Sequence, residues 1–137
     1  MEKGSKRNGS IIVMVLMIGT FIMVVASVAL RSGTLLYELA LDRVTYLKQL
    51  HAAQALAYYG IAYCKMRKEE KRESHSLSFA HWPLPSGPYE GSITIEPIKK
   101  GYIVAAILLR QNEELCSIQA EIECPKEEWR IVSWQSG

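Results

Sequence analysis

The sequence lacks the residue groupings on which catalytic and metal sites are usually built. His51, His75 and His81 do not share a ligand spacing with cysteines or carboxylates. There is no glycine-rich phosphate loop and no nucleophile elbow, and no motif brings Ser, His and Asp together. These absences argue against an enzyme, a bound metal, a cofactor and a small-molecule substrate.

Basic residues are also not gathered into a stripe with interleaved aromatic residues, and the formal net charge is only +2. A nucleic-acid groove needs such a stripe to neutralise phosphates. Nucleic acid is therefore not an expected partner.

Charge is absent from the whole stretch between Ser10 and Leu30. As a helix, this apolar run would be about 31 Å long, which matches the hydrocarbon thickness of a bilayer. The sequence therefore predicts a single transmembrane helix over 10–30. The leader, 1–9, carries Lys3, Lys6 and Arg7 against Glu2. The positive-inside rule places it in the cytoplasm and puts the residues after Arg31 outside the cytoplasmic (inner) membrane.

A secretory signal peptide is the competing interpretation of this region. A basic start followed by an apolar stretch is typical of such peptides, and Ser27-Val28-Ala29 has the small-x-small spacing of a cleavage site. The apolar run is longer than a usual signal core, and the helical pattern continues through that site. A retained anchor is the preferred interpretation.

Proline is absent from Ser32 to Lys71, where apolar and small residues recur at helical spacing. One glycine, Gly33, interrupts the join to the anchor, and a single glycine costs a helix about 1 kcal/mol without ending it. We therefore expect the helix to continue outside the membrane over 31–72. A helix this long cannot be buried in a domain this small, so its first half must lie in lipid or against other subunits.

Prolines and glycines interrupt the chain over 73–91, which predicts a long surface loop held to the core by Phe79, Trp82 and Leu84. Alternating and apolar segments then predict a four-stranded antiparallel meander over 92–137. Pro97 makes the first strand, 92–98, an edge strand. The later strands are expected over 102–110, 115–123 and 129–135. The predicted fold class is α+β, with the long N-terminal helix packed on this sheet.

The three cysteines lie in the part expected outside the cytoplasm, where disulfides can form. Cys116 and Cys124 share a face of one predicted strand, but they are about 26 Å apart at about 3.3 Å per residue, too far to bond. Cys64, near the helix end, could pair with Cys116 or Cys124. Three free buried thiols are the open alternative.

The N-terminal half resembles the class III signal of type IV pilins and type II secretion pseudopilins. More narrowly, it is similar to the minor pilins related to PilX and to the large minor pseudopilin. The matching features, in chain order, are Gly9, the apolar run Ile11 to Leu30, Arg31-Ser32, Asp42-Arg43, Ala52-Ala53-Gln54-Ala55 and Gly60-Ile61. The resemblance covers roughly the first half of the chain; beyond Cys64 only the order of elements agrees.

The resemblance implies that a prepilin peptidase cuts between Gly9 and Ser10 and that the new terminus is methylated. The chain departs from most pilins by having Ser10 after the cut, and Met14 where a glutamate is usual. Family members without that glutamate tend to be minor subunits at a filament tip.

These observations lead to the hypothesis of a non-enzymatic minor pilin or pseudopilin. It would assemble with other such subunits into a filament or tip complex serving secretion, adhesion or DNA uptake. Gly19, Ala26, Ser27 and Gly33 would permit close helix approach, and Asp42 or Arg43 would pair with a neighbour. The alternatives are a single-pass envelope protein that tethers a small binding domain, and a secreted enzyme or inhibitor released by signal peptidase.

Overall fold

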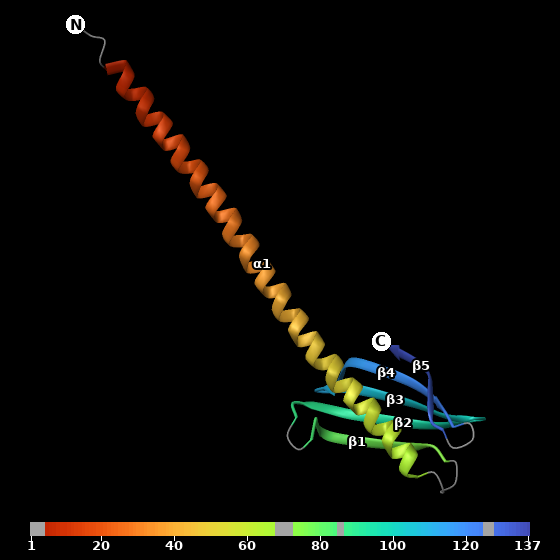
Figure 1. The fold of residues 1–137 in the computed structure, drawn as a ribbon. Coiled ribbons are helices and arrows are strands. Elements are labelled where there is room, and N and C mark those ends of the chain that lie inside the picture. Colours follow the sequence, from red (N-terminus) through yellow and green to blue (C-terminus); the bar gives the residue numbers. More distant parts are fainter. Residues whose placement is uncertain (1–4, 68–72, 85–86, 125–127) are drawn as a thin grey trace. The chain divides into compact units, whose positions relative to one another are not determined.

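A computed structural model of the chain describes residues 5–67, 73–84, 87–124 and 128–137. A helix, α1 (Ser5–Met66), is followed by five strands (Figure 1). They are β1 (His75–Trp82), β2 (Tyr89–Ile98), β3 (Gly101–Arg110), β4 (Glu113–Glu123) and β5 (Arg130–Ser136). The predicted α+β class is confirmed. The chain divides into two compact units, residues 1–44 and 45–137, which are described separately below.

The helix α1 begins before the apolar run and continues through Gly33. It is helical throughout the predicted span, 10–30, and through most of the predicted extension. It ends at Met66, and Arg67 lies in a turn. The helix was predicted to continue to 72. Within the described residues it ends at Met66, and residues 68–72 lie outside the described part of the chain.

The sheet belongs to the second unit, and its strands follow one another in the order β1-β2-β3-β4-β5. Every neighbouring pair is antiparallel, so the sheet is a meander as predicted. At the connection between β3 and β4, Gln111 and Asn112 have φ angles of 52° and 65°. Two consecutive residues with positive φ are typical of a type I′ turn, whose twist matches that of the flanking strands.

The prediction of four strands was wrong, because β1 occupies part of the predicted loop 73–91. Leu77 and Phe79 point toward the core, while Ser76 and Ser78 are exposed, so the segment has the alternation of an edge strand. The described prolines of this region, Pro83 and Pro88, lie between β1 and β2 and do not interrupt either strand. Trp82 is buried as expected, but Leu84 is 55% exposed and does not hold this region to the core.

The prediction that 92–98 forms an edge strand was also wrong, since β2 lies between β1 and β3. Pro97 is compatible with this position because the pairing with β1 ends at Ile95, opposite His75. Pro97 pairs only with Tyr102 of β3. The missing N–H of proline therefore removes no bond to β1.

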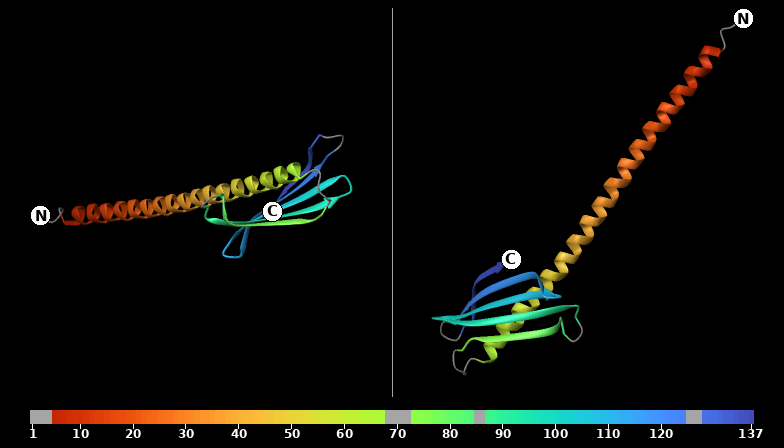
Figure 2. Two further views of the ribbon diagram at one scale, coloured as in Figure 1. Left: turned by 90° about the horizontal axis from the view of Figure 1, so that it is seen from below. Right: turned by 180° about the vertical axis from the view of Figure 1, so that it is seen from behind.

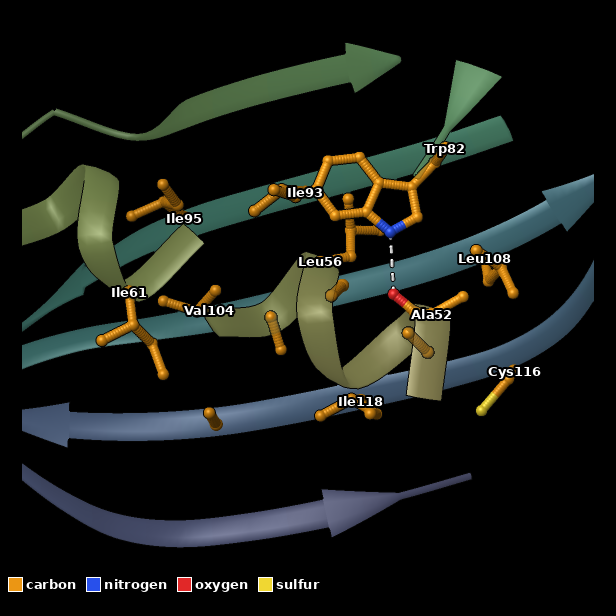
Figure 3. Close-up of a cluster of buried hydrophobic side chains, with 14 of the residues drawn as sticks. Ala52, Leu56, Ile61, Trp82, Ile93, Ile95, Val104, Leu108, Cys116 and Ile118 are labelled. Atoms are coloured by element: carbon orange, nitrogen blue, oxygen red, sulfur yellow. Dashed lines mark hydrogen bonds between the residues drawn. The ribbon is translucent and has the colours of Figure 1, made fainter. Parts of the chain in front are cut away.

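The hydrophobic core of the second unit lies between the C-terminal part of α1 and one face of the sheet (Figures 2 and 3). Leu56 is fully buried among Ile93, Leu108 and Ile118 in this core. The Nε1–H of Trp82 donates a hydrogen bond of 2.8 Å to the carbonyl oxygen of Ala52 (Figure 3). This bond satisfies the polar edge of a buried indole and ties β1 to the helix.

Small residues set the closest approach of the helix to the sheet. A Cβ at Gly60 would lie 2.7 Å from Cγ1 of Val104 and 2.9 Å from Cγ2 of Ile93. Ala53 and Ala57 are completely buried on the same helix. At Gly60 the backbone of the helix therefore lies directly against side chains of β2 and β3. Leu56, one turn earlier on the helix, is fully buried close to Gly91 of β2.

Candidate assembly surface

The apolar run of α1 exposes its side chains all around the helix. Every large hydrophobic residue from Ile11 to Leu30 is more than half exposed, from 51% at Ile18 to 76% at Met23. This segment is long and apolar enough to cross a membrane. A helix that is apolar on every side requires lipid or protein around it.

Hydroxyl groups within and next to this run donate to backbone carbonyls of the same helix. Thr20 Oγ1 donates to the Met17 carbonyl at 2.9 Å, and Ser27 Oγ donates to the Val24 carbonyl at 2.8 Å. Ser32 and Thr34 make equivalent bonds just beyond Leu30. These polar residues can therefore lie in an apolar environment without an unpaired donor.

Apolar exposure continues beyond the length that a bilayer core can cover. Leu35, Leu36 and Leu39 are 60%, 67% and 65% exposed. Leu41 and Val44 extend this exposed surface to the end of the first unit. Because 10–30 already spans about 31 Å, the later side chains need cover from something other than that hydrocarbon layer.

The small residues predicted to permit close helix approach are open on their surfaces. A Cβ placed at Gly9, Gly19 or Gly33 would meet no atom within 4 Å. Within the part of the chain that the structure describes, packing therefore does not explain these glycines, in contrast to Gly60. Ala26 and Ser27 are exposed on the same stretch.

The residues of the predicted processing site lie near the beginning of α1. Gly9 and Ser10 are helical and exposed, and Met14 is 65% exposed. Terminal turns of helices open at low cost, so the bond between Gly9 and Ser10 lies where local unwinding is easiest.

Asp42 and Arg43 are exposed helical residues of the first unit. Consecutive helical residues point about 100° apart, so the two charges lie on different faces of α1. Each charge can therefore meet a different neighbour.

The cysteines are all free thiols in the structure, so neither predicted pairing of Cys64 is present. Cys64 and Cys116 are buried, whereas Cys124 is half-buried and lies just beyond β4. Burial raises the pKa of the Cys64 thiol to about 11, and this outweighs a backbone hydrogen bond that lowers it. Burial, followed by the nearby charge of Glu114, also raises the pKa of Cys116. Neither thiol is activated as a nucleophile.

A small cavity of about 10 Å³ lies beside Cys64, between Tyr63, His75 and Tyr102. Its volume suits about one water molecule and no larger ligand. Arg67 lies over the ring of Tyr63 at 5.0 Å from the centroid, which places a cation at the rim.

Histidine, cysteine and carboxylate side chains do not form a group that could hold a metal ion within the described residues. His75 contacts the ring of Tyr63 with the centroids 6.3 Å apart, and His51 and His81 are exposed.

Sequence reasoning missed the aromatic contacts that flank α1. Tyr59 packs edge-on against Phe79 and Trp82, with ring centroids 5.4 and 5.8 Å away. On the other side of the helix, Tyr58 packs on Trp134 of β5 at 5.2 Å. The adjacent tyrosines gave a signal in the sequence, since a pair on one helical turn can reach both sides of a helix that lies along a sheet.

No family model matches this sequence, and comparisons with curated proteins and with solved structures found no match.

Proposed function

We propose that the protein is a minor pilin-like or pseudopilin-like subunit. Its helix α1 first anchors the chain in the cytoplasmic membrane, with the N-terminus inside, and then packs against other subunits in a filament or tip complex. The proposal rests on the resemblance of the N-terminal half together with the exposure of α1. Its role is assembly, with no reaction of its own.

The observation that carries the proposal is the exposed apolar surface over Leu35 to Val44. A plain membrane anchor needs apolar cover only over about 20 residues. Here the apolar surface continues past Arg31, where burial against other protein subunits removes it from water. Each fully buried leucine contributes on the order of 1.5 to 3 kcal/mol to such an association.

The open glycines support the same role. In a lipid-embedded helix, glycine permits close approach of another backbone. A Cβ at Gly19 or Gly33 would meet no atom of the described residues within 4 Å, so both positions are open to a neighbouring helix. Met14 adds a finer expectation. With no carboxylate at this position, the helix does not need the compensating partner that a buried charge requires, which suits a minor subunit of a tip complex.

The decisive experiment is mass spectrometry of the mature N-terminus of protein isolated from its native membrane. We expect it to begin at Ser10 with a methylated amine, and Gly9→Leu to abolish this processing. Gly19→Leu, a matched change deeper in α1, is expected to leave the cut in place. An intact Met1 would instead indicate a plain anchor, and a start at Leu30 would indicate a secreted domain.

A further inference from the structure

The sheet has a second face, opposite the helix, on which apolar side chains form a central row. Along β3, alternate residues Val104, Ala106 and Leu108 are completely buried against α1. The intervening residues point to the other face and are partly exposed; they are Ile103, Ala105, Ile107 and Leu109. In Figure 2 no described helix covers this face.

Polar side chains border the row on both sides in a regular pattern set by the strand register. Leu109 lies between Glu90 of β2 and Glu114 of β4. Ile107 lies between Ser92 and Ser117, and Ala105 lies between Thr94 and Gln119. At the other end Ile103 lies between Glu96 and Glu121. The face is thus an apolar track whose two ends are each flanked by a pair of carboxylates.

The track is hollowed beside its middle. An open depression of about 300 Å³ is lined by Ala105 and Ile107 of β3 and by Glu114, Ser117 and Gln119 of β4, and it extends to Gln135, Ser136 and Gly137 at the end of the chain. The polar rows on β2 and β4 are two strand spacings apart, about 10 Å, which is close to the width of an α-helix with its side chains.

A complementary surface exists on α1 of the same chain, in the first unit. Leu36, Leu39 and Arg43 follow the spacing i, i+3, i+7 and therefore share one face of the helix, with Ala40 beside them. Around the helix axis, Asp42 is about 100° and Glu38 about 140° from Arg43, which lies near the centre of this face. Asp42 is about 60° from Leu39 and therefore borders the face. This face, which we call the Leu36–Arg43 face, is apolar with one positive charge, and its large side chains are exposed.

We infer that the Leu36–Arg43 face of one copy docks on the outer face of the sheet of a second copy. Arg43 lies between Glu90 and Glu114, and Leu39 and Leu36 lie over Ile107 and the depression beside it. Arg43 and Leu36 are about 10 Å apart along the helix, and the Leu109 and Ala105 rows are about 14 Å apart along the strands. With Arg43 at the Leu109 row, Leu36 therefore reaches the space between the Ile107 and Ala105 rows.

This contact joins two different surfaces, so each copy keeps one free surface of each kind. Such a head-to-tail contact either closes into a ring or continues as an open filament. The inference rests on the proposed assembly role of α1, but it does not depend on cleavage after Gly9.

The test uses the full chain in lipid bilayers, as a mixture of isotope-labelled and unlabelled copies. A photo-crosslinking amino acid at Leu39 should join labelled to unlabelled chains through a β3 peptide that contains Ile107. At Tyr37, about 200° around the helix, the same group should give at least about tenfold less of this product.

Charge reversal provides the second arm. Arg43→Glu, or Glu90→Lys together with Glu114→Lys, should each reduce the crosslink by about tenfold or more, since like charges then face each other. A mixture of these two variants should restore it, because each helix then meets a face of opposite charge. Lys48→Glu makes the same change of charge at an exposed residue off this face and should have little effect.

Crosslinks from residue 39 that reach only α1 of another copy, only lipid or only a different protein would overturn the inference. So would a mixture of the two charge-reversed variants that does not restore the crosslink. The outcome separates from that of the proposed function. Processing at Ser10 without the β3 crosslink refutes only this contact. The crosslink with an intact Met1 keeps this contact and refutes the pilin-like assignment.

Discussion

At the scale of single residues, glycines of one helix have opposite environments. Gly60 faces Val104 and Ile93 at distances that leave no room for a Cβ, whereas Gly33 faces open space. The sequence alone places both within one continuous predicted helix. Their different surroundings give a direct experimental contrast.

We expect Gly60→Ala to destabilise the second unit by about 1 to 3 kcal/mol, because the added methyl group forces α1 away from β2 and β3. Gly33→Ala is the control and should leave the free energy of unfolding unchanged, or raise it by up to about 1 kcal/mol through helix propensity. Denaturant unfolding measures both. Equal effects of the two changes would contradict the packing described here.

The thiol of Cys64 provides a pH-dependent prediction. Its pKa is raised from an ordinary value of 9.0 to about 11 in the folded protein. The unfolded chain therefore loses this proton first as the pH rises. The stability contributed by the neutral thiol is fully present below pH 9, falls between about pH 9 and 11 and then levels off.

The measurement compares the parent with Cys64→Ala by unfolding at several pH values, so that other titrating groups cancel. The parent should lose stability relative to the variant between pH 9 and 11. Alkylation of Cys64 should also be slow in the native protein at pH 8, and faster at the half-buried Cys124. A constant difference across this pH range would show that Cys64 is not buried as described.

At the scale of secondary-structure elements, the turn between β3 and β4 fixes the register of these two strands, which form the longest pairing of the sheet. Gln111 and Asn112 both have positive φ angles. Asparagine tolerates this conformation better than glutamine does.

We expect Gln111→Gly to raise the free energy of unfolding by up to about 1 kcal/mol, since glycine adopts positive φ without steric cost. Asn112→Val should lower it by about 1 kcal/mol or more, because a β-branched residue is strained there. Thermal unfolding of the two variants checks this. A loss of stability in Gln111→Gly, or a gain in Asn112→Val, would indicate another type of turn.

At the scale of the whole molecule, the hydrophobic core and the membrane-length apolar run belong to different units. Every buried residue of the core lies between Ala52 and Ile122. The described residues of the first unit, up to Val44, are not among the residues of this core.

We therefore expect a fragment of residues 45–137 to remain soluble without detergent and to unfold cooperatively. The full chain should need detergent or lipid, because Ile11 to Leu30 are exposed. Circular dichroism and sedimentation of the two proteins test this. A fragment that aggregates or lacks a cooperative transition would show that residues before Thr45 contribute to the core.

Sequence by itself determined the helix, its apolar run, most of the strands and the α+β class. These features depend on local patterns along the chain. Residues 10–30 carry no charge, apolar residues recur at helical spacing after Ser32, and apolar and polar residues alternate along β4. Of the alternating residues predicted to face the helix, Cys116, Ile118, Ala120 and Ile122 are buried as predicted. Cys124, the last of this set, lies beyond β4 and is only half-buried. The Gly9 processing site and the membrane orientation stay predictions.

Only the tertiary structure decided which neighbours these elements have. β1 was missed because its core-facing residues, Leu77, Phe79 and Trp82, lie in a region rich in proline and glycine and do not alternate strictly. Pairing with β2 stabilises this strand. The structure also separates Leu36, which is exposed, from Ala57, which is buried, although both belong to the same predicted apolar helix face. Burial depends on contacts between residues distant in sequence, and periodicity carries no information about them.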